Sequence, residues 1–173
     1  AATEITPRTA VFLHVDDTFG TASFDRLFPM GVAAMLEAAD LVVAGKHREV
    51  VQDESQASYE GWFRAAEARI HWNQHVDWIH NTIRGADPAP GAWTTIGGKK
   101  LQLFGSRKHL VRTFGEVKGK IGEIAEIGSE SMRVTAQGGQ IEVSKVKPEE
   151  GKKVAAAEWA KAAGVTVGTI LGT

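Results

Sequence analysis

The chain has 173 residues, of which 43% are hydrophobic and 24% are charged, so it can bury a core and is no disordered polyelectrolyte. It contains no cysteine, which excludes a disulfide scaffold, a thiolate zinc site and a cysteine nucleophile. The net charge is −1, but residues 1–98 carry −6 and residues 99–173 carry +5, which indicates two units with different surroundings.

The first 48 residues are predicted to be mostly helical. Residues 12–15 resemble a short strand, and Asp16, Asp17 and Thr18 offer oxygen atoms that can cap a helix. Residues 23–28 are predicted to form a short helix. Pro29 suits the first turn of the next helix, which Gly45 ends.

A polar segment without periodicity follows, so residues 49–66 are interpreted as a linker. Asn73 is then expected to cap a helix that Gly85 ends. The apolar stripe of this helix would consist of Val76, Ile79, His80 and Ile83.

After residue 91 the hydrophobic pattern changes to a period of two. The predicted strands are residues 92–96, 100–104, 117–127, 132–136 and 141–146, with hairpin turns at Gly97-Gly98 and Gly138-Gly139. An alanine-rich helix is expected over residues 154–163. The predicted fold class is α+β, with N-terminal helices and a linker followed by a small OB-like β-barrel with one C-terminal helix. The predicted domains are 1–48, 49–66 as linker, and 67–173.

Catalytic and metal motifs are weak. His71, His75 and His80 lie near Asp77, but a packing or capping role explains them better than a zinc site, so no metal is expected. No GxSxG, GxGxxG, P-loop or HExxH motif occurs. The pair Asp16-Asp17 flanks a predicted helix start, which favours capping over acid–base catalysis.

A basic run gives the candidate binding residues. They are Lys99, Lys100, Arg107, Lys108, Arg112, Lys118 and Lys120. A small barrel with a basic face is a plausible nucleic-acid surface, and the competing interpretation is the solvated face of an exposed hairpin. Of the five tryptophans, four lie within residues 62–93, where they are expected to anchor the linker onto the barrel.

Four segments from the predicted linker to the first predicted strand carry a recognisable pattern, namely residues 59–61 (YEG), 67–72 (EARIHW), 79–85 (IHNTIRG) and 88–93 (PAPGAW). Together they resemble the family of formyltransferases that use 10-formyltetrahydrofolate, which includes methionyl-tRNA formyltransferase and the hydrolase domain of 10-formyltetrahydrofolate dehydrogenase. Residues 16–18 (DDT) and 27–31 (LFPMG) look most like the dehydrogenase branch. Residues 151–153 (GKK), 155–163 and 168–172 (GTILG) look like the segment that closes the barrel.

This resemblance covers residues 15–172 but not the family's catalytic Asn-His-Asp constellation. Those residues belong to HPS-containing and GLDTG-like motifs that would precede Asp16, and neither motif occurs here. The resemblance therefore implies the C-terminal region of a formyltransferase or hydrolase, with 10-formyltetrahydrofolate as the family substrate and no catalytic residue to carry over.

Three functional hypotheses follow. The chain acts with an N-terminal catalytic half, or it is a barrel module that binds transfer RNA, or it is a scaffold subunit of a larger one-carbon enzyme. No apolar run reaches the roughly 18 residues of a membrane span, and residues 1–10 do not resemble a signal peptide. We therefore expect a cytoplasmic location and no membrane partner.

Overall fold

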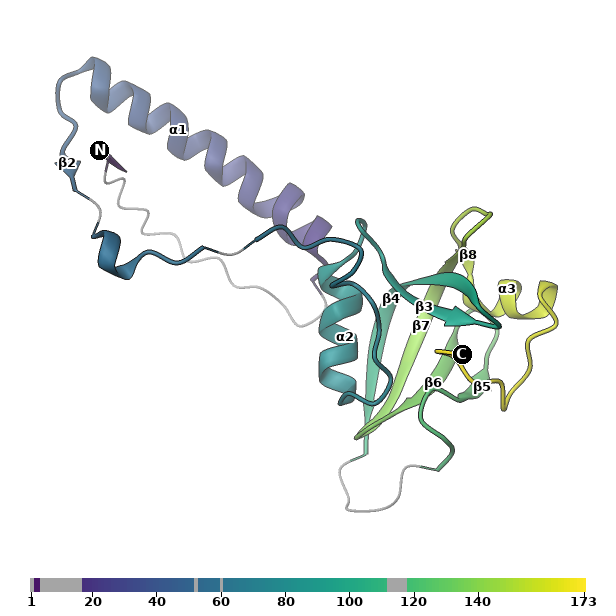
Figure 1. Ribbon diagram of the computed structural model, residues 1–173. Coiled ribbons are helices and arrows are strands. Elements are labelled where there is room, and N and C mark those ends of the chain that lie inside the picture. Colours follow the sequence, from purple (N-terminus) through teal and green to yellow (C-terminus); the bar gives the residue numbers. More distant parts are fainter. Residues whose placement is uncertain (1, 4–16, 52, 60, 112–117) are drawn as a thin grey trace. The chain divides into compact units, whose positions relative to one another are not determined.

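The computed structural model describes residues 2–3, 17–51, 53–59, 61–111 and 118–173, and the chain divides into two compact units, residues 1–62 and 63–173 (Figure 1). The predicted strand at 12–15 and Asp16 lie outside the described residues. The interpretation of residues 49–66 as a linker stays a prediction. No described helix is long and apolar enough to cross a membrane.

The first unit is dominated by one continuous helical segment. A π-helical turn, η1 (Thr21–Leu27), leads directly into α1 (Phe28–Val43), where two separate helices were expected. Pro29 lies in the first turn of α1, as predicted, and the backbone widens just before it because proline lacks an N–H. Short strands β1 (Ala2–Thr3) and β2 (Glu49–Val50) pair antiparallel, and a 3₁₀ turn, η2 (Glu54–Gln56), follows.

The second unit begins with helix α2 (Val76–Gly85), which buries the predicted apolar stripe. The expectation that Asn73 caps this helix is wrong. His75 is the cap, because its Nδ1 accepts a hydrogen bond from the backbone N–H of Asp77 at 3.3 Å. Histidine is uncommon as a helix cap, so the sequence favoured asparagine.

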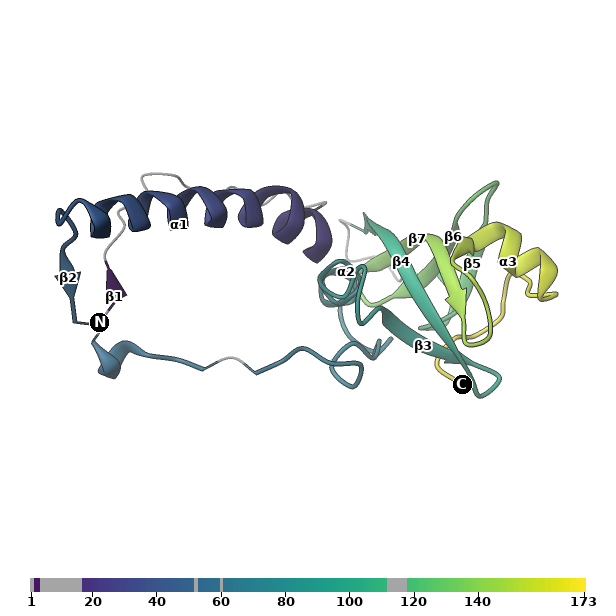
Figure 2. The ribbon, with the colours of Figure 1, turned by 90° about the horizontal axis from the view of Figure 1, so that it is seen from above.

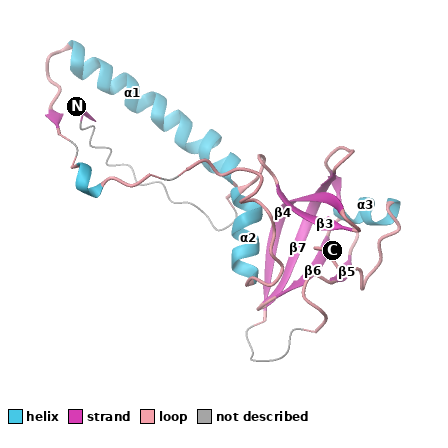
Figure 3. Ribbon diagram, viewed as in Figure 1, coloured by secondary structure: helices cyan, strands magenta, loops and turns pink. Residues whose placement is uncertain are grey.

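Six strands of this unit form one antiparallel sheet, whose strands are magenta in Figure 3. The strands are β3 (Ala92–Ile96), β4 (Lys99–Leu110), β5 (Ile124–Ile127), β6 (Met132–Ala136), β7 (Gly139–Pro148) and β8 (Val154–Ala155). Their order is β3-β4-β7-β6-β5, and β8 pairs with β7. Both predicted glycine turns connect neighbouring strands, with Gly97 and Gly98 at φ 54° and 79°.

The strand predictions differ in accuracy. Strands 92–96 and 132–136 are confirmed. β4 continues six residues beyond residue 104, where Arg107 and Lys108 break the apolar alternation. β5 begins at Ile124 rather than at residue 117, and residues 112–117 lie outside the described chain. The last helix, α3 (Ala156–Ala162), starts two residues later than expected, after β8.

Between the described residues the sheet is open, so the α+β class is confirmed but a closed barrel is not. The C-terminal segment hydrogen-bonds to both outer strands. On one side, the Ile124 N–H donates to the Thr169 carbonyl at 2.8 Å. On the other, the Gly172 N–H donates to the Thr95 carbonyl at 2.7 Å. Figure 2 shows α2 and α3 flanking the sheet from opposite sides.

A single hydrophobic cluster holds the second unit together. It joins the stripe of α2 to sheet residues such as Leu101, Met132 and Ile141, and includes Leu171 of the C-terminal segment. Trp72 lies in this cluster and donates its indole N–H to Thr94 Oγ1 at 2.9 Å. Each fully buried aliphatic side chain contributes about 1.5–3 kcal/mol, so the cluster is the main source of stability.

Candidate functional site

The predicted basic residues do not gather in one place. Six of the seven are described, namely Lys99, Lys100, Arg107, Lys108, Lys118 and Lys120, and Arg112 lies outside the described chain. Lys99 begins β4 and Arg107 lies eight residues later, about 26 Å further at the usual rise of an extended strand. Lys118 and Lys120 are exposed in the segment before β5. The nucleic-acid role of this set stays a prediction.

Lys108 has a structural partner. Its ammonium lies 2.6 Å from Asp77 Oδ1, which connects β4 to the first turn of α2. The hydrogen bond from Lys108 is the largest cause that holds the pKa of Asp77 below its usual value. Lys108, a member of the predicted basic run, therefore links β4 to α2 by an ion pair.

A different basic surface lies on β3, β4 and β7. Trp93, Gln102 and Lys147 stand opposite one another on these strands, and Lys145 stands opposite Phe104. Opposite residues of an antiparallel sheet project from the same face. Two cations, Arg69 and Lys100, lie 5.4 and 5.0 Å from the ring centroid of Trp93. We call this set the basic face: Arg69, Trp93, Lys100, Lys145, Lys147 and Lys153.

Lys153 completes the basic face, over the ring of Phe104. Its ammonium lies 3.5 Å from the centroid of that ring and 3.6 Å from Asp87 Oδ1. Of the residues of the basic face, only Lys100 belongs to the predicted basic run. The alternation of Lys145 and Lys147 along one strand could have indicated two of its members, but the strand pairing that adds Trp93 and Arg69 is not visible in the sequence.

Trp93 also explains part of the tryptophan cluster. Its indole N–H donates to the carbonyl of Ala65, and its backbone exchanges hydrogen bonds with Ala68 and Ile70. The segment before α2 is therefore anchored along β3, as expected. Trp62 and Trp78, in contrast, are exposed.

The histidine group has structural roles. His80 is 3% exposed, and its Nδ1 lies 2.8 Å from Ser106 Oγ. His75 caps α2, and His71 is exposed. Across the described ranges, no three histidine or carboxylate side chains are placed to hold a metal ion.

The capping prediction for residues 16–18 holds for Thr18. Its Oγ1 accepts the backbone N–H of Thr21 at 3.2 Å, at the start of η1. Asp17 instead pairs with Arg26, with Oδ2 and Nη1 2.8 Å apart. Asp16 lies outside the described residues.

An apolar surface runs along η1 and α1, which bury no residue. We call it the apolar helix face, formed by Leu27, Phe28, Val32, Met35 and Leu36 with Ser23 and Gly31. A groove of about 580 Å³ follows it. A contiguous apolar surface of this kind is typical of an interaction site.

Comparison with known proteins identifies relatives along most of the chain. Methionyl-tRNA formyltransferase of Moorella thermoacetica is 32% identical over 148 residues, which are 86% of this chain and 46% of that protein. The human mitochondrial 10-formyltetrahydrofolate dehydrogenase is 45% identical over 80 residues, which are 46% of this chain and 9% of that protein. The chain thus spans about half the length of the methionyl-tRNA formyltransferases it matches.

A solved structure shares the fold. The crystal structure of a HypX variant from Aquifex aeolicus superposes with a TM-score of 0.69 at 20% identity, covering 90% of this chain and 27% of that chain. The family description "Formyl transferase, C-terminal domain" matches residues 63–164, more than half of the chain. The anchored PGAW segment, the open sheet and this match together place the chain in the formyltransferase family, of which it carries the C-terminal domain.

Proposed function

We propose that this chain is the C-terminal region of a 10-formyltetrahydrofolate-using formyltransferase or hydrolase, and that it acts with an N-terminal catalytic half in the same or another polypeptide. The apolar helix face is the observation that carries the proposal. A helix of 16 residues without a buried side chain gains little from its own propensity and needs a packing partner. The relatives of about twice this length agree with such a partner.

Neither His75 nor His80 fits the catalytic chemistry of the family. A catalytic histidine and asparagine would have to touch the formyl group, polarise it and stabilise its oxyanion. His80 is buried and lies within hydrogen-bond distance of Ser106, and His75 caps α2. Neither side chain is therefore placed to contact a formyl group. Support for a folate substrate comes from relatives alone. One solved HypX structure holds tetrahydrofolic acid.

The test is reconstitution with an N-terminal half that carries the HPS and GLDTG motifs. We expect a one-to-one complex that releases tetrahydrofolate from 10-formyltetrahydrofolate, with the formyl group passing to water as formate or to an amine acceptor supplied in the assay, while each half alone is inactive. Met35→Ser together with Leu36→Ser should weaken the complex, because both side chains are exposed on the apolar helix face. Glu37→Gln on the same helix is the matched control. A complex unaffected by the double variant contradicts the proposed surface, and absence of both complex and activity contradicts the function.

A second candidate function is binding of transfer RNA, supported by the basic face. Cations combined with an aromatic ring are typical of surfaces that bind nucleic acid through phosphates and stacking. Transfer-RNA binding should weaken steeply with salt, and Lys145→Gln with Lys147→Gln should reduce the salt slope by about two. The matched control is Arg107→Gln with Lys118→Gln, from the predicted run. A larger effect of the control pair would favour the predicted basic run as the binding surface. Absence of binding at low salt would contradict a role in transfer-RNA binding.

The scaffold-subunit hypothesis makes a different prediction. Native mass measurement of the purified assembly should then show this chain together with several other subunits. A monomer, or a complex with the N-terminal half alone, contradicts it. A cytoplasmic location stays part of the proposal.

A further inference from the structure

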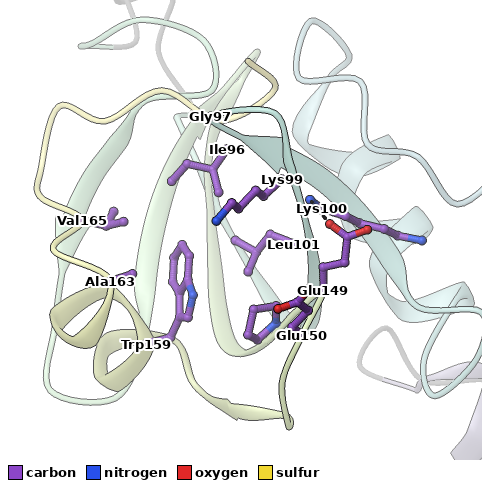
Figure 4. A pocket seen from close by; sticks show the side chains of 11 residues that line it. Ile96, Gly97, Lys99, Lys100, Leu101, Glu149, Glu150, Trp159, Ala163 and Val165 are labelled. Atoms are coloured by element: carbon purple, nitrogen blue, oxygen red, sulfur yellow. Dashed lines mark hydrogen bonds between the residues drawn. The ribbon is translucent and has the colours of Figure 1, made fainter.

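A cavity of about 570 Å³ lies between the β3–β4 turn, the segment after β7 and α3 (Figure 4). Ile96, Leu101, Trp159 and Val165 form its apolar walls. This volume lies within the range of sites for small molecules, which are mostly apolar with a few polar groups. The cavity shares no lining residue with the apolar helix face.

Two hydrogen-bond donors border the cavity without a partner. Among the described residues, Lys99 forms no ion pair, and the indole N–H of Trp159 has no acceptor. The other core tryptophans differ, since Trp72 donates to Thr94 and Trp93 donates to a backbone carbonyl. In Figure 4 the Lys99 side chain reaches toward Trp159, and the indole nitrogen lies on the ring edge that faces Leu101. Both donors are available to an acceptor placed in the cavity.

The remaining charges restrict what this acceptor can be. The ammonium of Lys100 lies over Trp93, so Lys99 is the cation left for the cavity. Glu149 accepts the backbone N–H of Lys100 at 3.5 Å, and Glu150, the next residue, also lines the cavity (Figure 4). These carboxylates repel any anion, most strongly one that carries several negative charges, such as a polyphosphate or a nucleic acid, and Lys99 can offset the charge of a single carboxylate only.

We propose that this cavity binds a small aromatic monocarboxylate. The carboxylate accepts hydrogen bonds from Lys99 Nζ and Trp159 Nε1, and the aromatic ring lies against the part-exposed side chains of Ile96 and Val165. A charge-assisted hydrogen bond supplies the preference for an acid, and the indole and aliphatic walls supply the preference for a flat apolar body. The inference does not depend on the proposed function, because no residue of the cavity belongs to the apolar helix face.

The experiment is a titration of the full chain with 2-naphthoate, followed by two-dimensional ¹H–¹⁵N NMR. We expect shifts of the amides of Gly97, Lys99 and Leu101 and of the Trp159 indole N–H. The neutral analogue 2-naphthamide should bind about tenfold more weakly, because it lacks the charge that pairs with Lys99. Equal binding of the two probes, shifts confined to α1, or no shift at millimolar 2-naphthoate would overturn the proposal.

Variants localise the interaction. Lys99→Gln should weaken 2-naphthoate binding about tenfold and leave 2-naphthamide unchanged, whereas Lys118→Gln, an exposed lysine outside the cavity, should change neither. Ala163 lines the cavity and is exposed, so Ala163→Phe should fill its mouth and abolish binding while the remaining spectrum keeps its dispersion. If Lys99→Gln and Ala163→Phe both bind 2-naphthoate as tightly as the wild type, the proposed location of the site is wrong.

Discussion

The two units of this chain differ in how far their apolar side chains are buried. In residues 63–173, α2 and the sheet bury theirs in one continuous cluster. In η1 and α1, no side chain is buried, and large residues such as Phe28, Met35 and Val43 are exposed. Because tertiary packing supplies most helix stability, the second unit has its own source of stability and α1 lacks one. We therefore expect residues 63–173 to fold by themselves and α1 to need a packing partner.

The largest effect should come from separating the two regions. A fragment of residues 63–173 should unfold cooperatively with nearly the stability of the whole chain, because its core is internal. A peptide of residues 17–48 should show little helix in water, since it lacks a packing partner. Circular dichroism during thermal unfolding measures both. A stable, cooperative helix in the peptide would show that the apolar helix face needs no partner.

The next effect tests the C-terminal segment as part of the core. Leu171 is 2% exposed, and its backbone N–H bonds to the Gly122 carbonyl at 2.8 Å. Leu171→Ala should lower the free energy of unfolding in urea by about 2–5 kcal/mol, through lost burial and a residual cavity. Val167, four residues earlier, is 57% exposed, so Val167→Ala should cost less than about 0.5 kcal/mol. Similar losses in both variants would mean that the segment is loosely held.

A smaller change should stabilise the second unit. Thr135 is fully buried on β6, and among the described residues its Oγ1 has no hydrogen-bond partner. Thr135→Val replaces the hydroxyl with a methyl group of similar size and should raise the free energy of unfolding by about 1 kcal/mol. Thr166→Val, at an exposed position, is the control. A loss of stability at position 135 would indicate a buried water on the hydroxyl.

The smallest effect concerns pH. Glu142 on β7 accepts a hydrogen bond from His109 at 2.6 Å and one from Ser131 at 2.9 Å, and these lower its pKa from the usual 4.5. A carboxylate with a lowered folded-state pKa stabilises the fold above the unfolded-state pKa, and this contribution is lost as the pH falls below about 4.5.

Glu142→Gln should therefore lower Tm at pH 7 and flatten the fall of Tm below pH 4.5. The loss at neutral pH should be about 1 kcal/mol or less, because the pair is partly exposed. Glu150 is exposed and forms no ion pair with another described residue, so Glu150→Gln is the control. The same pH profile in wild type and Glu142→Gln would contradict the role of this carboxylate.

Local patterns in the sequence predicted several elements correctly. The stripe of α2, the strands at 92–96 and 132–136 and the turn at Gly97-Gly98 depend on residues close together in the chain, where periodicity and turn chemistry act directly. The second half of β4 was missed because it is specified by pairing with β7, whose partner residues lie 29 to 37 positions away in the sequence. The same limit explains the cap at His75, which also lies against Gln137 in an isolated bridge.

The candidate sites also differ in whether local sequence or long-range pairing defines them. The basic run over 99–120 is a property of the sequence, yet β4 separates its members and assigns Lys108 to Asp77. The basic face and the cavity beside Trp159 join residues from β3, β4, β7 and α3, whose separation in sequence exceeds any local motif.

By itself, the sequence determined the α+β class, the secondary elements with strong periodicity and the membership in the formyltransferase family, because short motifs and alternating patterns carry that information. Only the tertiary structure decided which basic residues share a face, that the C-terminal segment joins both outer strands, and that Lys99 and Trp159 border one cavity. Strand register and side-chain direction bring these groups together, and both depend on long-range pairing that periodicity does not encode.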